Sequence, residues 1–417
     1  MLGRVKRLKR EWAVTLMAFV TALLLWSASG AFAGEKVLVG FRGRPNAAAV
    51  AALGARVDHV YDLVPALAAE VPSAKLAALR RLAGVLYVEP DYPVYATELA
   101  PAASWLDLGV GVLFDPGTET LPWGIDRVNA PAVWTGLTPN FGEGVAVAII
   151  DTGLDYTHPD LADNCVMGYD FVNNDWDPKD DNGHGTHVAG IIAARDDGPN
   201  SGGANTGGIS VVGVAPRASL YIAKCLNANG SGSTSDIVAA INVAARYHIK
   251  LVNMSFGSLS SSTTLKQACN NAYAAGVLLV AAAGNEYRGK LSFPARYASV
   301  VSVGAIDSSN TRAGFSNFGN TLTLCAPGVN ILSTLPTYPV TLNNPTYGYQ
   351  MYYDYLDGTS MACPHVVGAA ALVYAAHPGW TNTQVRQQLT ATAFDLGTPG
   401  WDQYYGYGLV DAAAAAQ

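Results

Sequence analysis

Uncharged apolar runs that alternate with helical segments constrain the fold of this chain more than any other feature. A strand that is apolar along its whole length is typical of a parallel sheet covered on both faces. Such strands are predicted at Val145–Ile150, Ser219–Ala223, Leu251–Met254, Val277–Ala282 and Val300–Val303. Helices are expected between and after them, at His184–Arg195, Ser235–Tyr247, Thr264–Ala275 and Thr383–Thr392. The alternation predicts a large α/β domain with a mostly parallel central sheet flanked by helices.

A smaller unit precedes this domain. Strands predicted at 36–41, 57–63, 67–71 and 85–88 combine with helices at 46–53 and 74–82 in the order βαββαβ. This order is typical of a small α+β, ferredoxin-like domain, which we assign to residues 35–96. Residues 97–120 are weakly patterned and form a linker. Residues 121–417 are then the large domain.

The first 33 residues have the three parts of a secretory signal peptide. Five basic residues precede the apolar segment Trp12–Trp26, and Ala31–Ala33 supplies a small-x-small cleavage site. An uncleaved membrane anchor is the alternative. No later run is long and apolar enough to span a bilayer, so we expect a secreted, extracellular protein without a stable membrane anchor.

Charge and cysteine content narrow the function further. Residues 97–417 hold 25 of the 32 acidic residues but only 13 of the 25 basic ones. An acidic body disfavours nucleic-acid binding. The five cysteines, Cys165, Cys225, Cys269, Cys325 and Cys363, form no C-x-x-C pair, and their odd number leaves at least one free thiol. We expect Cys225, Cys269 and Cys325, which lie in apolar surroundings, to be free and buried, with one disulfide as the alternative.

One serine stands out by its position. The segment Gly358–His365 delivers Ser360 to the start of a long uncharged run, Val366–Ala376, which is expected to be a buried helix with Pro364 in its first turn. A serine at a helix start is either an N-cap or, if a base and an oxyanion donor lie nearby, a nucleophile.

Three further polar residues lie at strand ends or helix starts. Asp151 ends an apolar strand, where α/β sheets place functional groups; the Asp-Thr-Gly triplet of aspartic proteases would need a second copy, which the chain lacks. His184 lies between two glycines and is a candidate base, whereas His187 is expected to be packed and hydrogen-bonded. The alternative is that the two histidines bind zinc, but no third ligand is evident. Asn285 is either a turn residue or an oxyanion donor.

The order Asp, His, Asn, Ser resembles that of the subtilisin-type serine proteases. Seven stretches carry the resemblance, which covers about Leu121 to Gln417: Ala148–Gly153 with His158–Asp160, His184–Gly190, Val214–Pro216, Asn253–Gly257, Ala281–Asn285, Gly358–His365 and the closing Gly406–Ala413. It implies an endopeptidase in which Ser360 is the nucleophile, His184 the base, Asp151 its orienting carboxylate and Asn285 an oxyanion donor.

The resemblance also implies how substrates bind. Protein or peptide substrates would add a strand between two flanking segments and fill an S1 pocket, through Gly230, Ser231, Gly232, Ser255, Phe256, Gly257, Ala282, Gly284 and Glu286. Broad cleavage after large apolar or aromatic residues is expected, with Glu286 also admitting a basic side chain. The alternatives are a more selective processing protease and an inactive binding protein of the same fold. We expect a monomer.

Residues 35–96 resemble the propeptide of these enzymes, an intramolecular inhibitor and chaperone. Self-cleavage is expected between Tyr95 and Thr120; a permanent second domain is the alternative. The segment Tyr338–Tyr355 is longer than the usual connection in the family. It is either a hairpin that shapes the primed side of the cleft or an exposed insertion.

Structural calcium is expected at two places. Asp170, Asp175 and Asp177 put several hard oxygens on one loop, which suits Ca²⁺ and resembles a loop of the thermitase branch. By resemblance, a second site joins Glu119, Asp160 and the loop 205–211.

Overall fold

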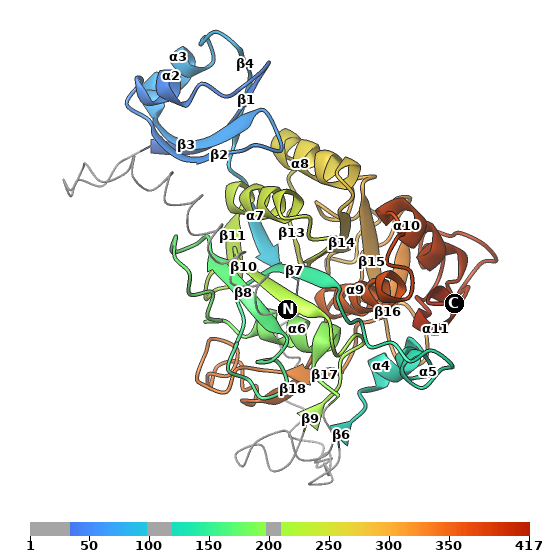
Figure 1. Ribbon diagram of the computed structural model, residues 1–417. Coiled ribbons are helices and arrows are strands. Elements are labelled where there is room, and N and C mark those ends of the chain that lie inside the picture. Colours follow the sequence, from blue (N-terminus) through green and yellow to red (C-terminus); the bar gives the residue numbers. More distant parts are fainter. Residues whose placement is uncertain (1–33, 98–118, 197–209) are drawn as a thin grey trace.

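A seven-stranded parallel sheet forms the centre of the large domain (Figure 1). The structure is a computed structural model that describes residues 34–97, 119–196 and 210–417; the expected signal peptide and most of the linker lie outside these ranges. In spatial order the strands are β16 (Leu324–Pro327), β15 (Val300–Ile306), β14 (Leu278–Ala282), β12 (Leu251–Met254), β7 (Ala146–Asp151), β10 (Ser219–Lys224) and β8 (Cys165–Asp170). The predicted α/β fold is confirmed.

Helices cover both faces of this sheet, and β7 shows how the sequence directs the packing. Val147 and Ile149 face one core and Ala148 and Ile150 face the other, because successive side chains of a strand point to opposite sides. The first face carries α6 (His184–Ala193), α9 (Thr359–Ala376), α10 (Asn382–Ala391), α11 (Ala412–Ala415), α4 (Trp123–Arg127) and α5 (Ala130–Trp134). The second carries α7 (Thr234–Arg246) and α8 (Thr263–Ala274).

Helix α9 begins earlier than the sequence predicted. It starts at Thr359, so Pro364 lies in its second turn and not in the first. A proline in that place leaves the carbonyl four residues earlier without its helical N–H donor. That carbonyl belongs to Ser360, and Ser255 Oγ donates to it at 2.9 Å. The expectation that no run after the signal peptide is long and apolar enough to span a bilayer was wrong: helix α9 meets both criteria. However, 89% of it is buried inside the protein, as is typical of a core helix.

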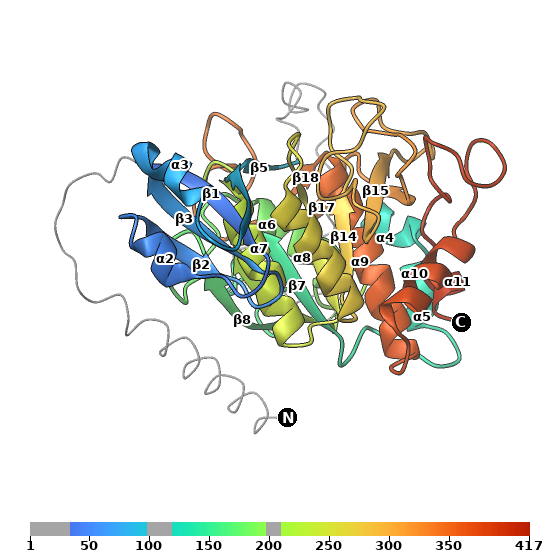
Figure 2. The same ribbon diagram turned by 90° about the horizontal axis from the view of Figure 1, so that it is seen from above.

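The small domain has the predicted βαββαβ order. Its antiparallel sheet runs β2-β3-β1-β4, built from β1 (Gly34–Phe41), β2 (Arg56–Val60), β3 (Ala66–Pro72) and β4 (Val85–Pro90). One face packs against α2 (Ala47–Ala51) and α3 (Leu76–Leu79), and the exposed 3₁₀ turn η1 (Ser73–Lys75) leads into α3. The other face lies on α7 and α8 of the large domain, as Figure 2 shows from above.

Short strands complete the molecule. After β4, the chain forms β5 (Pro93–Ala96), which pairs antiparallel with both β11 (Ser231–Ser233) and β13 (Phe256–Gly257). Strands β17 (Ile331–Thr334) and β18 (Tyr353–Leu356) form a hairpin, and β6 (Glu119–Thr120) pairs with β9 (Ser210–Val211). All five cysteines are free.

Candidate active site

Asp151 and His184 form a buried pair. Asp151 ends β7, and His184 begins α6. His184 Nδ1 lies 2.6 Å from Asp151 Oδ1, and neither side chain is exposed to solvent. The same Oδ1 accepts a hydrogen bond from the backbone N–H of Thr152 at 2.7 Å. The carboxylate therefore orients the imidazole from one side and leaves Nε2 as its other polar atom.

Two glycines bring these elements together. Gly183, the N-cap of α6, has φ 116°, a left-handed conformation that favours glycine. A Cβ on Gly185 would collide with the carbonyl oxygen of Gly153, so the start of α6 approaches the loop after β7 too closely for any side chain. The glycines that flank His184 thus shape the backbone around it.

Asp180, which sequence analysis missed, joins the two segments. Its Oδ1 accepts hydrogen bonds from Thr152 Oγ1 at 2.9 Å and from the N–H groups of Asn182 and Gly183, and its Oδ2 accepts two from Thr186. A buried carboxylate with five donors is a rigid junction. Asp180 could have been found from the sequence as an aspartate shortly before a glycine-flanked histidine at a helix start.

Asn285 and Ser360 converge on one peptide carbonyl. Asn285 follows β14, and its Oδ1 accepts hydrogen bonds from the N–H and hydroxyl of Thr359 at 2.9 and 2.8 Å. This anchors the amide, whose Nδ2 donates to the carbonyl oxygen of Thr97 at 2.7 Å. The N–H of Ser360, in the first turn of α9, donates to the same oxygen at 3.3 Å.

Thr97 also contacts the hydroxyl of Ser360. Its N–H lies 3.1 Å from Ser360 Oγ and its own Oγ1 lies 2.6 Å away. Ser360 Oγ donates its proton to the carbonyl of Ser255 at 2.7 Å, so Thr97 Oγ1 is the donor in the shorter contact. Thr97 occupies both the carbonyl site and the surroundings of the serine hydroxyl.

The residues before Thr97 bind as a substrate strand would. Val94 and Tyr95 pair with Gly232 and Ser231 on one side, and Ala96 pairs with Phe256 on the other. The N–H of Ala96 donates to the Gly230 carbonyl at 2.8 Å. Both predicted flanking segments thus hold one added strand, as in recognition by β-augmentation.

A cavity of about 390 Å³ lies beside this strand. Besides residues of β5 and Thr97, it is lined by Gly257, Ser258, Leu259, Ser260, Asn285 and Glu286. The carboxylate of Glu286 accepts a hydrogen bond from Asn317 Nδ2 at 2.5 Å. Gly284 has φ 101° and turns the chain beside Glu286. Ala282, predicted as pocket wall, instead packs into the core on the α9 side of the sheet.

The small domain contacts the large one through two carboxylates at helix starts. Glu89 accepts four hydrogen bonds of 2.8–2.9 Å from Ser262, Thr263 and Thr264, at the N-terminus of α8. Asp91 accepts two from Ser235 at the start of α7. Burial raises the pKa of Asp91, against the opposing effect of those hydrogen bonds. Anions at helix N-termini are stabilised by unpaired N–H groups and by the helix dipole.

The predicted calcium ligands fall into two different situations. The carboxylate of Asp170 is occupied by its own loop, because it accepts hydrogen bonds from Val172 N–H and from Asn173 N–H and Nδ2. No group of three or more Asp, Glu, His or Cys side chains suited to a metal ion occurs within 34–97, 119–196 and 210–417. The structure therefore does not assemble Asp170, Asp175 and Asp177 into a metal centre.

Glu119 and Asp160 both contact β9. Glu119 pairs with Ser210, and Val211 N–H donates to Asp160 Oδ2 at 3.0 Å. Tyr353 also donates to that oxygen, at 2.9 Å, and Asp160 is completely buried. Residues 205–209 of the predicted loop lie outside the described ranges.

His187 is packed as predicted. Its Nε2 lies 3.0 and 3.1 Å from the carbonyl oxygens of Ile331 and Asp354. Burial lowers its pKa to about 3. A neutral, enclosed imidazole bonded to backbone carbonyls acts as a structural residue, and the zinc interpretation has no third ligand in the part of the chain that the structure describes.

A peptide carbonyl held by two N–H donors beside a serine hydroxyl is the arrangement that a serine protease imposes on its substrate. The sequence profile of the subtilase family matches residues 142–408. The chain is 48% identical over 300 residues to subtilisin Savinase of Lederbergia lenta, covering 72% of this chain and all of that one. It is 43% identical over 360 residues to an alkaline protease of Alkalihalobacillus alcalophilus, covering 86% and 81%. With subtilisin NAT of Bacillus subtilis subsp. natto it shares 38% over 431 residues, covering 99% and 100%. The chain belongs to the subtilase family and is a subtilisin-type serine endopeptidase.

Proposed function

We propose that this protein is a secreted zymogen whose endopeptidase activity uses Ser360, His184 and Asp151. Ser360 Oγ attacks the peptide carbonyl and transfers its proton to His184 Nε2, which then protonates the leaving amine. Asp151 holds the imidazole and stabilises its charged form. Because Ser360 Oγ points to the Ser255 carbonyl beside Thr97, the side chain turns toward His184 for this step.

Stabilisation of the oxyanion falls to Asn285 Nδ2 and the N–H of Ser360. The observation that carries this proposal is their shared contact with the Thr97 carbonyl oxygen, at 2.7 and 3.3 Å. Donors already aimed at that atom stabilise the charge that develops on it without reorganisation.

The same contact supports the propeptide role of the small domain. Residues 34–97 reach the active site through β5 and place the carbonyl of Thr97, in the predicted 97–120 linker, where a scissile carbonyl would lie. We therefore assign the processing bond to the carboxyl side of Thr97. After cleavage, the strand and the helix contacts of Glu89 and Asp91 remain as an inhibitor.

One comparison tests nucleophile and bond together. The wild-type chain and Ser360→Ala are expressed, and the intact mass and N-terminal sequence of each product are determined. The wild type is expected to yield a mature chain that begins at residue 98, and Ser360→Ala is expected to stay joined to its propeptide and to be inactive on casein. A Ser360→Ala chain that matures in the absence of other proteases contradicts the nucleophile, and a different first residue contradicts the bond.

Broad specificity for large apolar or aromatic P1 residues is supported by the cavity beside Thr97. Threonine leaves about 390 Å³ of space there, and the part of the lining that belongs to the large domain is Gly257, Ser258, Leu259, Ser260, Asn285 and Glu286. Glu286 is the one acidic residue of that lining, which favours a general endopeptidase over a selective processing enzyme. Cleavage of a peptide library gives the distribution of P1 residues directly.

Secretion follows from the proposed signal peptide, residues 1–33. For calcium, Glu119 and Asp160 are better candidates than the 170–177 loop, because three donors of that loop already occupy the Asp170 carboxylate. A chelator is expected to lower the unfolding temperature first, with activity lost only as the protein unfolds. Asp160→Asn removes this chelator sensitivity, and Asp175→Asn keeps it. The reverse result places the ion in the 170–177 loop.

A further inference from the structure

The β17–β18 hairpin connects the segments that carry Ser360 and His184. Strand β18 ends at Leu356, three residues before Thr359, where α9 begins. Strand β17 packs along α6: Ser333 Oγ and Thr334 Oγ1 donate to the carbonyls of His187 and Thr186, each at 2.8 Å. One hairpin is therefore continuous with the serine segment and bonded to the histidine helix.

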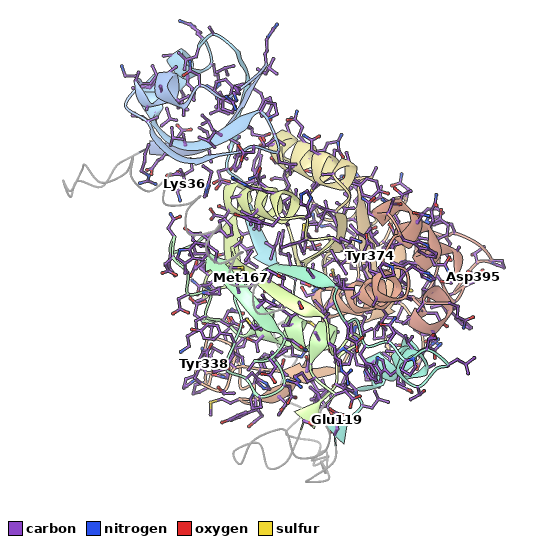
Figure 3. All side chains as sticks on the ribbon, in the orientation of Figure 1. Lys36, Glu119, Met167, Tyr338, Tyr374 and Asp395 are labelled. Carbon is purple, nitrogen blue, oxygen red and sulfur yellow. The ribbon has the colours of Figure 1, made fainter. Side chains whose placement is uncertain are left out.

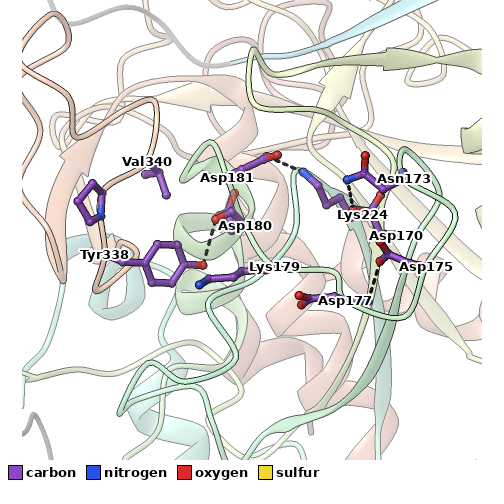
Figure 4. Close-up of a pocket in the computed structure, with 11 residues that line it drawn as sticks. Asp170, Asn173, Asp175, Asp177, Lys179, Asp180, Asp181, Lys224, Tyr338 and Val340 are labelled. Carbon is purple, nitrogen blue, oxygen red and sulfur yellow. Dashed lines mark hydrogen bonds and ion pairs between the residues drawn. The ribbon is translucent and has the colours of Figure 1, made fainter.

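The loop of this hairpin reaches further, to the residues just before His184. Tyr338 Oη donates to the carbonyl of Asp180 at 3.0 Å (Figure 4). The N–H groups of Thr341 and Leu342 donate to the carbonyls of Asp181 and Asn182, at 3.3 and 2.9 Å. Three consecutive carbonyls thus receive their donors from one loop.

Apolar packing completes this contact at Gly183. The side chains of Leu335 and Leu342 lie 3.4 Å from the place of a Cβ on Gly183, the N-cap of α6. On its opposite side, the segment 180–183 is tied to Thr152 through the Asp180 carboxylate. His184 consequently follows a backbone segment that is fixed from two directions.

The loop itself is held in shape by its own side chains. Asn343 accepts a hydrogen bond from Val340 N–H at 2.7 Å and donates to the Tyr338 carbonyl at 3.1 Å. Thr337 donates twice to Asp155 Oδ2. The ammonium of Lys179 lies 4.1 Å from the centre of the Tyr338 ring. Burial raises the pKa of Tyr338, with Asp180 and Asp155 acting in the same direction, so the phenol keeps the proton that it donates.

We propose that residues 335–343 are a positioning element for His184, with Tyr338 as its main residue. Because a base must lie within hydrogen-bond reach of the proton it removes, small displacements of the 180–183 segment reduce the rate of proton transfer. In Figure 3, Tyr338 lies well away from Lys36 of the small domain, so we expect the loop to act in the same way in the zymogen and in the mature enzyme. This inference rests on the proposed role of His184 as the base.

Tyr338→Phe is the sharpest test, since it removes one hydroxyl and keeps the ring over Lys179. In the mature enzyme, normalised by active-site titration, kcat is expected to fall roughly three- to tenfold with KM unchanged. The rate at which a phosphonylating agent labels Ser360 is expected to fall by the same factor. Asn343→Ala, which loosens the loop without touching 180–183, is expected to act in the same direction. Tyr347→Phe, on the exposed part of the loop, is the matched control and is expected to behave as wild type.

Each other outcome overturns the proposal. Unchanged kcat and labelling in both Tyr338→Phe and Asn343→Ala show that the contact does not position His184. A change in KM alone shows that the loop contacts substrate instead. An equal loss in Tyr347→Phe shows a general effect on the fold. Failure of the proposed triad is recognised separately, because the Ser360→Ala chain would then still mature in the absence of other proteases.

Discussion

The carbonyl oxygen of Thr97 lies 2.7 Å from Nδ2 of Asn285, although 187 residues separate them in the sequence. The amide of Asn285 is held by Thr359, the neighbour of Ser360, so one side chain links the Thr97 carbonyl to the segment that bears the proposed nucleophile. A change at Asn285 should therefore affect the reaction more than substrate binding.

Asn285→Asp keeps the acceptor for Thr359 and removes the donor to the oxyanion. In subtilisin, where loss of such a donor has been measured, kcat falls about 10²–10³-fold. A similar or larger loss is expected here, because a carboxylate also repels the developing charge, while KM changes little. Steady-state kinetics on a chromogenic peptide checks this. Comparable kcat values for the variant and wild type would remove Asn285 from the oxyanion hole.

Gly257→Ala should narrow the pocket for P1 side chains. A Cβ at this position would lie 2.9 Å from Ser292 Cβ and 3.4 Å from Thr97 Cγ2, so the methyl group projects beside the P1 side chain. The kcat/KM for a substrate with P1 Phe is expected to fall about tenfold more than that for P1 Ala, within the range for one methylene in a pocket. The same loss for both substrates would instead indicate damage to the backbone of β13.

Glu89→Gln should weaken the hold of the cleaved propeptide on the enzyme. The carboxylate accepts four hydrogen bonds at the start of α8, and charge-assisted bonds of this kind are the stronger ones. We expect roughly tenfold weaker inhibition, seen as a shorter lag between processing and the appearance of activity. Glu35→Gln, at an exposed position of β1, is the control. If Glu89→Gln and Glu35→Gln show equal lags, the contact between Glu89 and the start of α8 does not hold the propeptide on the enzyme.

Three buried histidines predict acid lability. Burial lowers the pKa of His158 and His365 to about 4 and that of His187 to about 3. The folded protein keeps these histidines neutral, whereas the unfolded chain protonates them below about pH 6.5. Above that pH they leave the free energy of unfolding unchanged. As the pH falls from about 6.5 toward their pKa values in the folded protein, the free energy of unfolding decreases.

With all three histidines, the free energy of unfolding should drop by about 4 kcal/mol per pH unit near pH 5. Thermal unfolding of the Ser360→Ala chain, which cannot digest itself, measures this slope. Substitution of the exposed His248 by Gln should leave this dependence of the free energy of unfolding on pH unchanged. A flat profile between pH 6.5 and 4.5 would contradict the prediction.

The sequence predicted the five inner strands of the central sheet, because each contains a continuous, uncharged and mostly apolar run. It missed the two edge strands, β8 and β16. Strand β12 has the predicted limits, and β10 and β14 each differ by one residue at one end. The start of α9 was wrong, because a proline was assumed to belong to the first turn. Only the tertiary structure shows why Pro364 can lie in the second turn. The hydroxyl of Ser255, about a hundred positions earlier, replaces the N–H donor that Pro364 cannot offer to the Ser360 carbonyl.

The candidate site divides in the same way. Asp151, His184, Asn285 and Ser360 could be proposed because each follows a strand or begins a helix, where side chains gather in α/β sheets. Thr97 and Tyr338 could not. Thr97 lies in a weakly patterned linker, and Tyr338 is one of many tyrosines in its segment. Their contacts depend on how distant parts of the chain meet, which local pattern does not encode.

The strand order of the central sheet also determines when this enzyme can first act. Strand β7 is made early but pairs only with β10 and β12, which are made later, and Ser360 follows all seven strands of the sheet in the chain. Pairing of strands far apart in sequence is slow. During synthesis, therefore, Asp151 and His184, the proposed orienting carboxylate and base, are made well before Ser360, the proposed nucleophile. The proposed triad cannot be complete until all seven strands of the sheet have been made.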